Sequence, residues 1–474
     1  MRRLRLLLAG MALVLLACLG TGAAAARTRP GGGEELAMAA GAFVDSVGVN
    51  LPAGDADAGW ALADRLRAAG IGHARGPAAT GPTDPALAGL RALAGADLRL
   101  DLVVGAGTDP EAAAGAAASL GAAVTALEAP AGERAVPLRR AVTAHPRLTG
   151  VAVLGDGPGA DYQTVRLALG GRCPACAADE LGSGDAAVQV TEVDLGPGMP
   201  DTVAARYLPR LLLANAGLAV RTYVTGSGDA GGPGLLDAAG TPTPAYHAVA
   251  GLLALLDDGH RQGRPGRLGF RLAGDTQDVR SRLLQKADGH FWLALWVEKP
   301  GWDPATRREL AVPAHRVTVA LDAPVAGART FVPELGTTPD RSYTDPPGAG
   351  RALDAIDLEV TDRVVLLELL PRRTDGTAPR ATSPPPAPAA ATPITQAPVV
   401  NGAGQTAPPT TGPDGDAARA VAAGRPTADL DPASRSPLAF TGSTALSMLV
   451  ASVLLMLVGV AALVSSRRRY HHRH

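Results

Sequence analysis

The sequence predicts an α/β fold, in which a (β/α)8 TIM-like barrel precedes an antiparallel β-sandwich, a disordered linker and a C-terminal transmembrane helix. Three observations predict it. Short apolar runs alternate with helical stretches over the first half of the chain, which is typical of βαβ units and a parallel sheet. The hydrophobic period then changes to two. A Pro-rich stretch finally precedes an uncharged apolar run close to the last residue.

Composition excludes several classes of protein. Hydrophobic residues make up 46% of the 474 residues but aromatic residues only 3%, so the core must consist mostly of Ala, Val and Leu. The net charge of −1 gives no basic excess to hold nucleic acid. Three Cys residues are too few for a disulfide-rich scaffold. No motif indicates a cofactor or a metal site.

The N-terminal residues 1–26 resemble a secretory signal peptide. Arg2, Arg3 and Arg5 precede the apolar run Leu6–Leu19, and the small residues Ala23–Ala26 suit signal peptidase. Export through this segment excludes a cytosolic protein. A permanent N-terminal anchor and lipoprotein processing at Cys18 are the alternatives. We expect residues 27–40 to form a flexible leader.

The barrel is predicted over residues 41–266. Apolar runs at seven places predict strands, and an eighth strand is expected within 161–170; the seven are Val44–Asn50, Gly72–Arg75, Leu98–Val104, Val124–Ala129, Gly150–Leu154, Val188–Val193 and Leu218–Val224. Helical stretches separate most of them, namely Ala58–Ala69, Asp84–Leu93, Asp109–Leu120, Arg134–Ala144, Asp201–Ala216 and Thr243–Leu256. Eight βα units in this length suit a compact barrel.

The β-sandwich is predicted over residues 267–372. The period of the pattern is two in this region, for example in Phe291–Trp296, Arg316–Leu321 and Val364–Leu369, which is typical of an antiparallel β-sandwich. Residues 373–437 are rich in Pro, Ala and Thr and carry few large apolar side chains. Such a segment cannot bury enough surface to offset its ordering entropy, so we expect an extended stalk.

The C-terminal residues 438–474 carry a motif, an apolar helix and a basic tail in that order. Leu438-Ala439-Phe440-Thr441-Gly442 precedes the uncharged stretch 444–464, which is long enough to cross a membrane. The basic residues Arg467, Arg468, Arg469 and Arg473 follow it, which places the preceding chain outside the cell.

This arrangement resembles the cell-wall sorting signal of Gram-positive surface proteins. Its Leu-Ala-x-Thr-Gly form is similar to that used by sortases of high-GC actinobacteria. The resemblance implies that a sortase attacks the carbonyl of Thr441, releases Gly442 and the residues after it, and transfers the chain to a peptidoglycan precursor. The sortase and the precursor are then partners, and the membrane is a partner before sorting. A plain single-pass membrane protein with an extracellular domain is the alternative.

The barrel and sandwich resemble the clan of retaining (β/α)8 glycoside hydrolases, whose acid/base and nucleophile are Glu residues at strands four and seven. The likeness is carried by Ser46–Asn50, Thr191-Glu192, Tyr207–Leu213, Arg221–Tyr223 and Gly240–Tyr246. It implies that Glu192 is the nucleophile. The acid/base position is not filled, because Ala131-Gly132 stand where the clan has Asn-Glu.

Three carboxylates are therefore candidates for catalysis. Glu192 is the possible nucleophile, and Glu128 and Glu133 are weaker acid/base candidates, because the reacting groups of such barrels lie at the carboxyl ends of strands. Each also has a structural interpretation: an ion pair with Arg75 or Arg221 for Glu192, a backbone hydrogen bond for Glu128, and a favourable helix N-terminal position for Glu133. Asp194 and Asp156 are minor candidates.

Cys173 and Cys176 are the two cysteines that remain after export. Outside the cell we expect a local disulfide between them rather than half of a zinc site or a redox motif. The function favoured by the sequence is that of an exported, wall-anchored surface protein with a catalytically degenerate barrel that binds glycan or serves as a scaffold. An active retaining glycoside hydrolase acting on extracellular or cell-wall glycan is the alternative.

Overall fold

The structure is a computed structural model, and it describes residues 33–51, 58–130, 132, 135–181, 187–227, 232–259, 264–344 and 353–372. These residues belong to one compact unit. The predicted signal peptide, the linker 373–437 and the sorting signal 438–474 lie outside the described residues. No helix in the described part of the chain is long and apolar enough to span a membrane.

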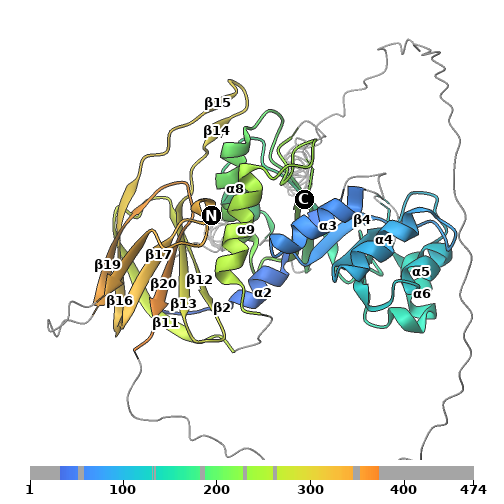
Figure 1. Cartoon of the computed structure of the whole chain (residues 1–474), viewed down its shortest axis with the longest axis horizontal. Helices are drawn as coiled ribbons and strands as arrows, with labels where there is room; N and C mark the ends of the chain where they lie inside the picture. Colours follow the sequence, from blue (N-terminus) through green and yellow to red (C-terminus); the bar gives the residue numbers. More distant parts are fainter. Residues whose placement is uncertain are drawn as a thin grey trace, which may run out of the picture. The chain divides into compact units, whose positions relative to one another are not determined.

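The first part of the unit is a nearly closed barrel of eight parallel strands (Figure 1). Around the sheet the order is β7-β6-β5-β4-β3-β10-β9-β8, and a parallel bridge between Leu154 and Tyr162 joins its two ends. The strands are β3 (Val47–Asn50), β4 (His73–Pro77), β5 (Arg99–Val103), β6 (Val124–Glu128), β7 (Ala152–Leu154), β8 (Gln163–Ala168), β9 (Val188–Asp194) and β10 (Ala219–Thr225). The eighth strand expected within 161–170 is β8.

Helices cover the outside of the sheet, as the alternating pattern predicts. They are α3 (Ala58–Ala68), α4 (Ala86–Gly95), α5 (Pro110–Ala118), α6 (Val136–Ala144), α7 (Pro174–Ala178), α8 (Asp201–Asn215) and α9 (Pro244–Leu256). Residues 155–162, between β7 and β8, form no helix, so this unit lacks its covering helix. An additional helix, α2 (Ala40–Asp45), precedes β3, where the sequence predicts the start of a strand.

The second part consists of two facing sheets, as expected for residues 267–372. One has the order β1-β11-β16-β19 and the other β18-β17-β20-β13-β12-β2. Their strands are β1 (Gly33–Leu36), β2 (Met38–Ala39), β11 (Arg267–Gly274), β12 (Val279–Gln285), β13 (Phe291–Val297), β16 (His315–Val325), β17 (Gly327–Phe331), β18 (Arg341–Thr344), β19 (Leu353–Val360) and β20 (Val365–Leu370).

The N-terminal strands correct the expectation of a flexible leader over residues 27–40. Strand β1 pairs antiparallel with β11 over four residues, and β2 pairs in parallel with β12 and forms the edge of that sheet. Residues 33–39 are therefore part of the sandwich. Short strands with exposed side chains give too weak an alternation for the sequence to reveal them, since they are formed by pairing with strands more than 200 residues away.

The six-stranded sheet is buried on both faces. In β13 the residues Trp292, Ala294 and Trp296 belong to the core that is continuous with the barrel, whereas Leu293 and Leu295 belong to the core between the two sheets. Successive side chains of a strand point to opposite faces, so one strand serves two cores. This arrangement explains why the barrel and the sandwich form a single compact unit.

Helices α8 and α9 lie side by side against the six-stranded sheet (Figure 1). Arg210 of α8 is fully buried and pairs with Glu298 at 2.6 Å, and Arg206 pairs with Asp362 at 2.9 Å. These contacts join α8 to the sandwich. The Nε and Nη1 atoms of Arg210 are buried and have no hydrogen-bond partner among the described residues, so burial of this pair carries a desolvation cost.

Candidate active site

The mouth of the barrel, where the strands end at their carboxyl termini, contains two ion pairs. In the first, both carboxylate oxygens of Glu128 accept hydrogen bonds from Arg75, at 2.8 Å from Nε and 2.9 Å from Nη2. Arg75 is the central residue of β4 and Glu128 is the last residue of β6. The side chain of Glu128 is only 11% exposed. Bidentate pairs of this kind are among the strongest side-chain hydrogen bonds.

Asn50 connects this pair to the opposite part of the barrel wall. Its Oδ1 accepts a hydrogen bond from Arg75 at 2.9 Å, and its Nδ2 donates to the carbonyl of Thr191 at 2.9 Å. Asn50 ends β3 and Thr191 lies in β9. The sequence therefore brings residues of four strands, β3, β4, β6 and β9, into one hydrogen-bonded chain across the mouth.

The second ion pair joins Glu192 of β9 to Arg166 of β8. The two residues are opposite each other because the register shifts after Val165, which leaves Thr191 as the extra residue of a β-bulge. The Glu192 side chain is 38% exposed and that of Arg166 is 73% exposed. Glu192 thus lies near a strand end and is accessible to solvent. Its structural interpretation predicted an ion pair with Arg75 or Arg221, whereas the partner in the structure is Arg166.

The other candidate carboxylates do not join these pairs. Asp194, exposed at the end of β9, accepts a hydrogen bond from the backbone of Gly196 at 2.8 Å. Asp156 is exposed in the segment after β7. Glu133 lies outside the described residues, as do Thr441 and Gly442. The backbone hydrogen bond expected for Glu128 is replaced by its ion pair with Arg75.

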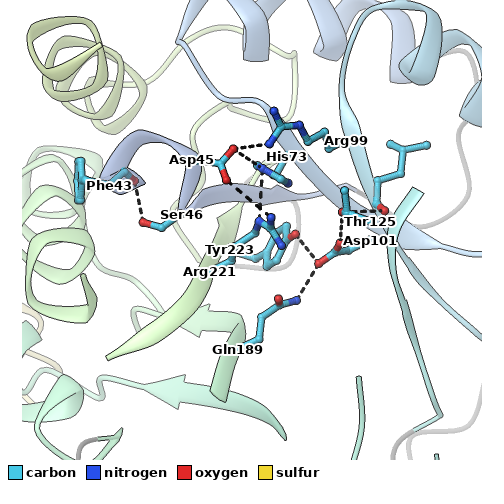
Figure 2. Close-up of polar contacts among 11 residues, drawn as sticks. Phe43, Asp45, Ser46, His73, Arg99, Asp101, Thr125, Gln189, Arg221 and Tyr223 are labelled. Carbon is cyan, nitrogen blue, oxygen red and sulfur yellow. Dashed lines mark hydrogen bonds and ion pairs between the residues drawn. The ribbon is translucent and has the colours of Figure 1, made fainter. Parts of the chain in front are cut away.

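Below the mouth, the barrel axis is polar. Asp101 of β5 is fully buried and accepts hydrogen bonds from Tyr223 at 2.5 Å, Gln189 at 2.7 Å and Thr125 at 2.7 Å, which Figure 2 shows converging on one carboxylate. Burial, followed by the charge of Asp101, raises the pKa of Tyr223 well above its usual value. Tyr223 is therefore a neutral donor that satisfies Asp101.

A third charged group closes the base of the barrel (Figure 2). Asp45, at the end of α2, contacts His73 at 3.1 Å, Arg99 at 2.5 Å and Arg221 at 3.8 Å. The hydrogen bond with His73, together with the positive charges of Arg99 and Arg221, lowers the pKa of Asp45 to about 2. Burial lowers the pKa of His73, which keeps the imidazole neutral at neutral pH. A pocket of about 240 Å³ adjoins Asp45 and Arg99.

Cys173 and Cys176 form a disulfide with Cα atoms 5.3 Å apart, at the start of α7. The loop it closes follows β8, directly after Arg172, and so belongs to the mouth. Within the described residues, no group of three or more His, Cys, Asp or Glu side chains is placed to hold a metal ion.

The sequence indicates Glu128 and Glu192 as candidates but not their partners. It predicts Arg75 as a possible partner of Glu192, whereas Arg75 binds Glu128 and Arg166 binds Glu192. A signal was available in β4, where His73 and Arg75 alternate with apolar residues. Charged residues at every second position of a barrel strand indicate a polar interior.

No protein-family model matches this sequence, and no curated protein matches it. Among solved structures, the chain is similar to a family 39 glycoside hydrolase from the gut symbiont Bacteroides cellulosilyticus WH2, with 12% identity over 70% of this chain and 82% of that one and a TM-score of 0.49. It is also similar to a family 30 subfamily 8 xylanase from Clostridium acetobutylicum, with 11% identity over 68% and 95% of the two chains and a TM-score of 0.44. The assignment of the barrel rests on the parallel strand order, not on these similarities.

Proposed function

We propose that this chain is an exported surface protein whose glycosidase-like barrel binds glycan and has little or no hydrolytic activity. The single observation that carries the proposal is the state of the two carboxylates at the mouth: Glu128 and Glu192 are each bound by a guanidinium. A retaining hydrolase needs one carboxyl group to donate a proton and a second to attack the sugar.

The acid is the missing component. Both oxygens of Glu128 already accept hydrogen bonds from Arg75, so its carboxyl group is engaged by a guanidinium and not by a leaving group. Loss of general acid catalysis costs about 10²–10⁴ in rate. Glu192, which is partly exposed, remains able to attack a sugar with a good leaving group. The alternative, an active retaining hydrolase, requires an acid from outside the described residues, such as Glu133.

The proposed location follows from the ends of the chain. The signal peptide supports export, and the motif 438–442 with the following apolar and basic residues supports attachment to the cell wall by a sortase. The peptidoglycan precursor is then the second partner. Without sorting, residues 444–464 hold the protein in the plasma membrane with its barrel outside the cell. Either form displays the barrel on the surface, where extracellular glycan is available to it.

The test combines binding and cleavage with the same purified protein. Cellulose, xylan, chitin and peptidoglycan sacculi are incubated with it, the bound fraction is measured, and released reducing sugar is followed. Activated aryl glycosides are tested as well, because their leaving groups depart without general acid catalysis. Cleavage of such a substrate is the most activity we expect, and Glu192→Gln should abolish it. Binding without turnover of the polysaccharides supports the proposal. Rapid release of sugar from any of them favours the active hydrolase. No binding to any of them, nor to the anionic oligosaccharides described below, refutes glycan recognition.

A further inference from the structure

A hairpin of the sandwich reaches the mouth of the barrel. It consists of β14 (Trp302–Asp303) and β15 (Arg308–Glu309) and lies beside one end of α8 (Figure 1). Arg206 of α8 pairs with Glu309 at 2.6 Å. A Cβ atom at Gly171, in the loop after β8, would lie only 2.4 Å from Pro304 Cδ. The hairpin is therefore packed directly on a loop that borders the mouth.

The hairpin also covers the loop after β9. The Arg307 Nε lies 3.9 Å from the position that a Cβ at Gly198 would occupy, and Gly198 follows Asp194 and Gly196 at the end of that strand. Arg307 is thus close to the loop that follows β9. The two loops meet as well, because a Cβ at Gly196 would lie 3.9 Å from the Gly170 Cα.

The turn of the hairpin is built to hold its shape. Asp303 accepts hydrogen bonds from the backbone of Ala305 at 2.9 Å and from the Thr306 hydroxyl at 2.6 Å, which is the way an Asp side chain stabilises a turn. Trp302 is 4% exposed and anchors the hairpin in the core. Arg307 adopts a φ of 51°, a conformation that a non-glycine residue seldom adopts without a structural reason.

This region offers a ligand two exposed arginines, Arg307 and Arg166, and three carboxylates beside them, Glu192, Asp194 and Glu309, are already engaged in a hydrogen bond or an ion pair. Arg307 is exposed, and no hydrogen bond or ion pair in the described part of the chain engages its guanidinium. Arg166 is 73% exposed and uses one nitrogen on Glu192, although a guanidinium has five N–H donors. Asp303 is occupied within its own turn. None of the described residues in the loops after β8, β9 and β10 is aromatic, so stacking on a sugar ring is not available there.

We propose that the β14–β15 hairpin forms one wall of the glycan site and that Arg307, with Arg166, selects a glycan carrying an anionic group, a carboxylate or a phosphate. The inference rests on the proposed function and specifies its ligand. Guanidinium groups bind both oxyanions through paired, charge-assisted hydrogen bonds. Because the described loops after β8, β9 and β10 hold no aromatic residue, recognition beside the hairpin depends on such polar contacts.

The experiment measures binding by isothermal titration calorimetry with three ligands: an oligogalacturonate, a phosphorylated oligosaccharide and a neutral xylo-oligosaccharide of the same length as the first. We expect an anionic ligand to bind, and to bind more weakly as salt is raised. Arg307→Ala should weaken its binding on the order of fivefold, as expected for an exposed charged contact. Arg316→Ala, which removes an exposed arginine of the sandwich strand β16, is the matched control and should change nothing.

A second pair of variants tests the wall itself. Gly171 and Gly217 have nearly the same φ, 81° and 80°, so alanine strains the backbone equally at both positions. Only at Gly171 does the new methyl group collide with Pro304, since nothing lies within 4 Å of a Cβ at Gly217. Gly171→Ala should displace the hairpin and weaken binding of the anionic ligand, whereas Gly217→Ala should leave that binding unchanged.

The outcomes separate this inference from the proposed function. Equal or tighter binding of the neutral oligosaccharide overturns the anionic class and leaves the proposed function standing. Anionic binding that neither Arg307→Ala nor Gly171→Ala weakens overturns the role of the hairpin. Failure of the protein to bind these ligands and every polysaccharide of the earlier panel refutes both. The two anionic ligands distinguish a carboxylate from a phosphate as the group recognised.

Discussion

The ion pair between Arg75 and Glu128 allows a direct test of the proposal that Glu128 is held by Arg75 and does not act as a catalytic acid. Arg75→Met removes the guanidinium but keeps an unbranched side chain of similar length. The Glu128 carboxylate, 11% exposed, then loses both hydrogen bonds and its counter-charge. Removing one partner of a buried ion pair lowers the free energy of unfolding by about 3–5 kcal/mol. Because Arg75 is itself 17% exposed, some water reaches the site, and we expect a loss near the lower limit, about 3 kcal/mol.

The assay is a double-mutant cycle in urea, followed by circular dichroism, with Arg75→Met, Glu128→Gln and the double variant. Glu128→Gln keeps one acceptor oxygen for Arg75, so we expect a smaller loss of about 1–2 kcal/mol and a coupling energy of about 2 kcal/mol. Arg166→Met is the matched control at the same mouth. Its pair with Glu192 is exposed, with side chains 73% and 38% accessible, so its loss should stay within about 0.5 kcal/mol. A coupling energy below about 0.5 kcal/mol would show that Arg75 does not restrain Glu128, and the reason for rejecting Glu128 as the acid would fail.

Three further predictions concern other parts of the chain. The pKa of Asp45 is lowered to about 2 from 3.8, so its ionised form stabilises the fold above pH 3.8, and this stabilisation is lost as the pH falls towards 2. Asp45→Asn should therefore lower the free energy of unfolding by about 1 kcal/mol at neutral pH, after allowance for solvent screening. In urea titrations at about pH 3 the difference between the two proteins should be smaller, and a constant difference would contradict the prediction. Non-reducing mass spectrometry should find Cys173 and Cys176 lighter by two hydrogens than the dithiol, and free thiols would be the contrary result. Thr441→Ala should abolish covalent attachment to the wall. Blots of wall fractions released by lysozyme measure this attachment, and its persistence in the variant would contradict the prediction.

The strands of the barrel could be predicted from the sequence because each depends on a local signal. Buried parallel strands such as Val124–Glu128 and Val188–Asp194 are short apolar runs between helical stretches, and length and spacing suffice to place them. The missing helix between β7 and β8 gave no such signal. Neither did β1, whose four residues are a strand only because β11 lies beside them.

The partners of the candidate site residues could not be predicted, because they depend on register. Glu192 faces Arg166 only because β9 carries one extra residue, Thr191, relative to β8. Without that bulge, every later residue of the strand would shift to the opposite face. The sequence names the charged residues at strand ends, but a choice among Arg75, Arg166 and Arg221 requires the pairing of strands that are far apart in the chain.

The carboxylates along the barrel axis share one property that bears on function. Asp45 at the base, Asp101 in the middle and Glu128 at the mouth each accept hydrogen bonds from donors of the surrounding strands. A carboxylate that accepts hydrogen bonds in this way stabilises the barrel that holds it. The interior of this barrel therefore acts as a structural polar core. The proposed function accordingly assigns recognition to side chains that are exposed at the mouth, and among the described residues these include Arg166, Glu192 and Arg307.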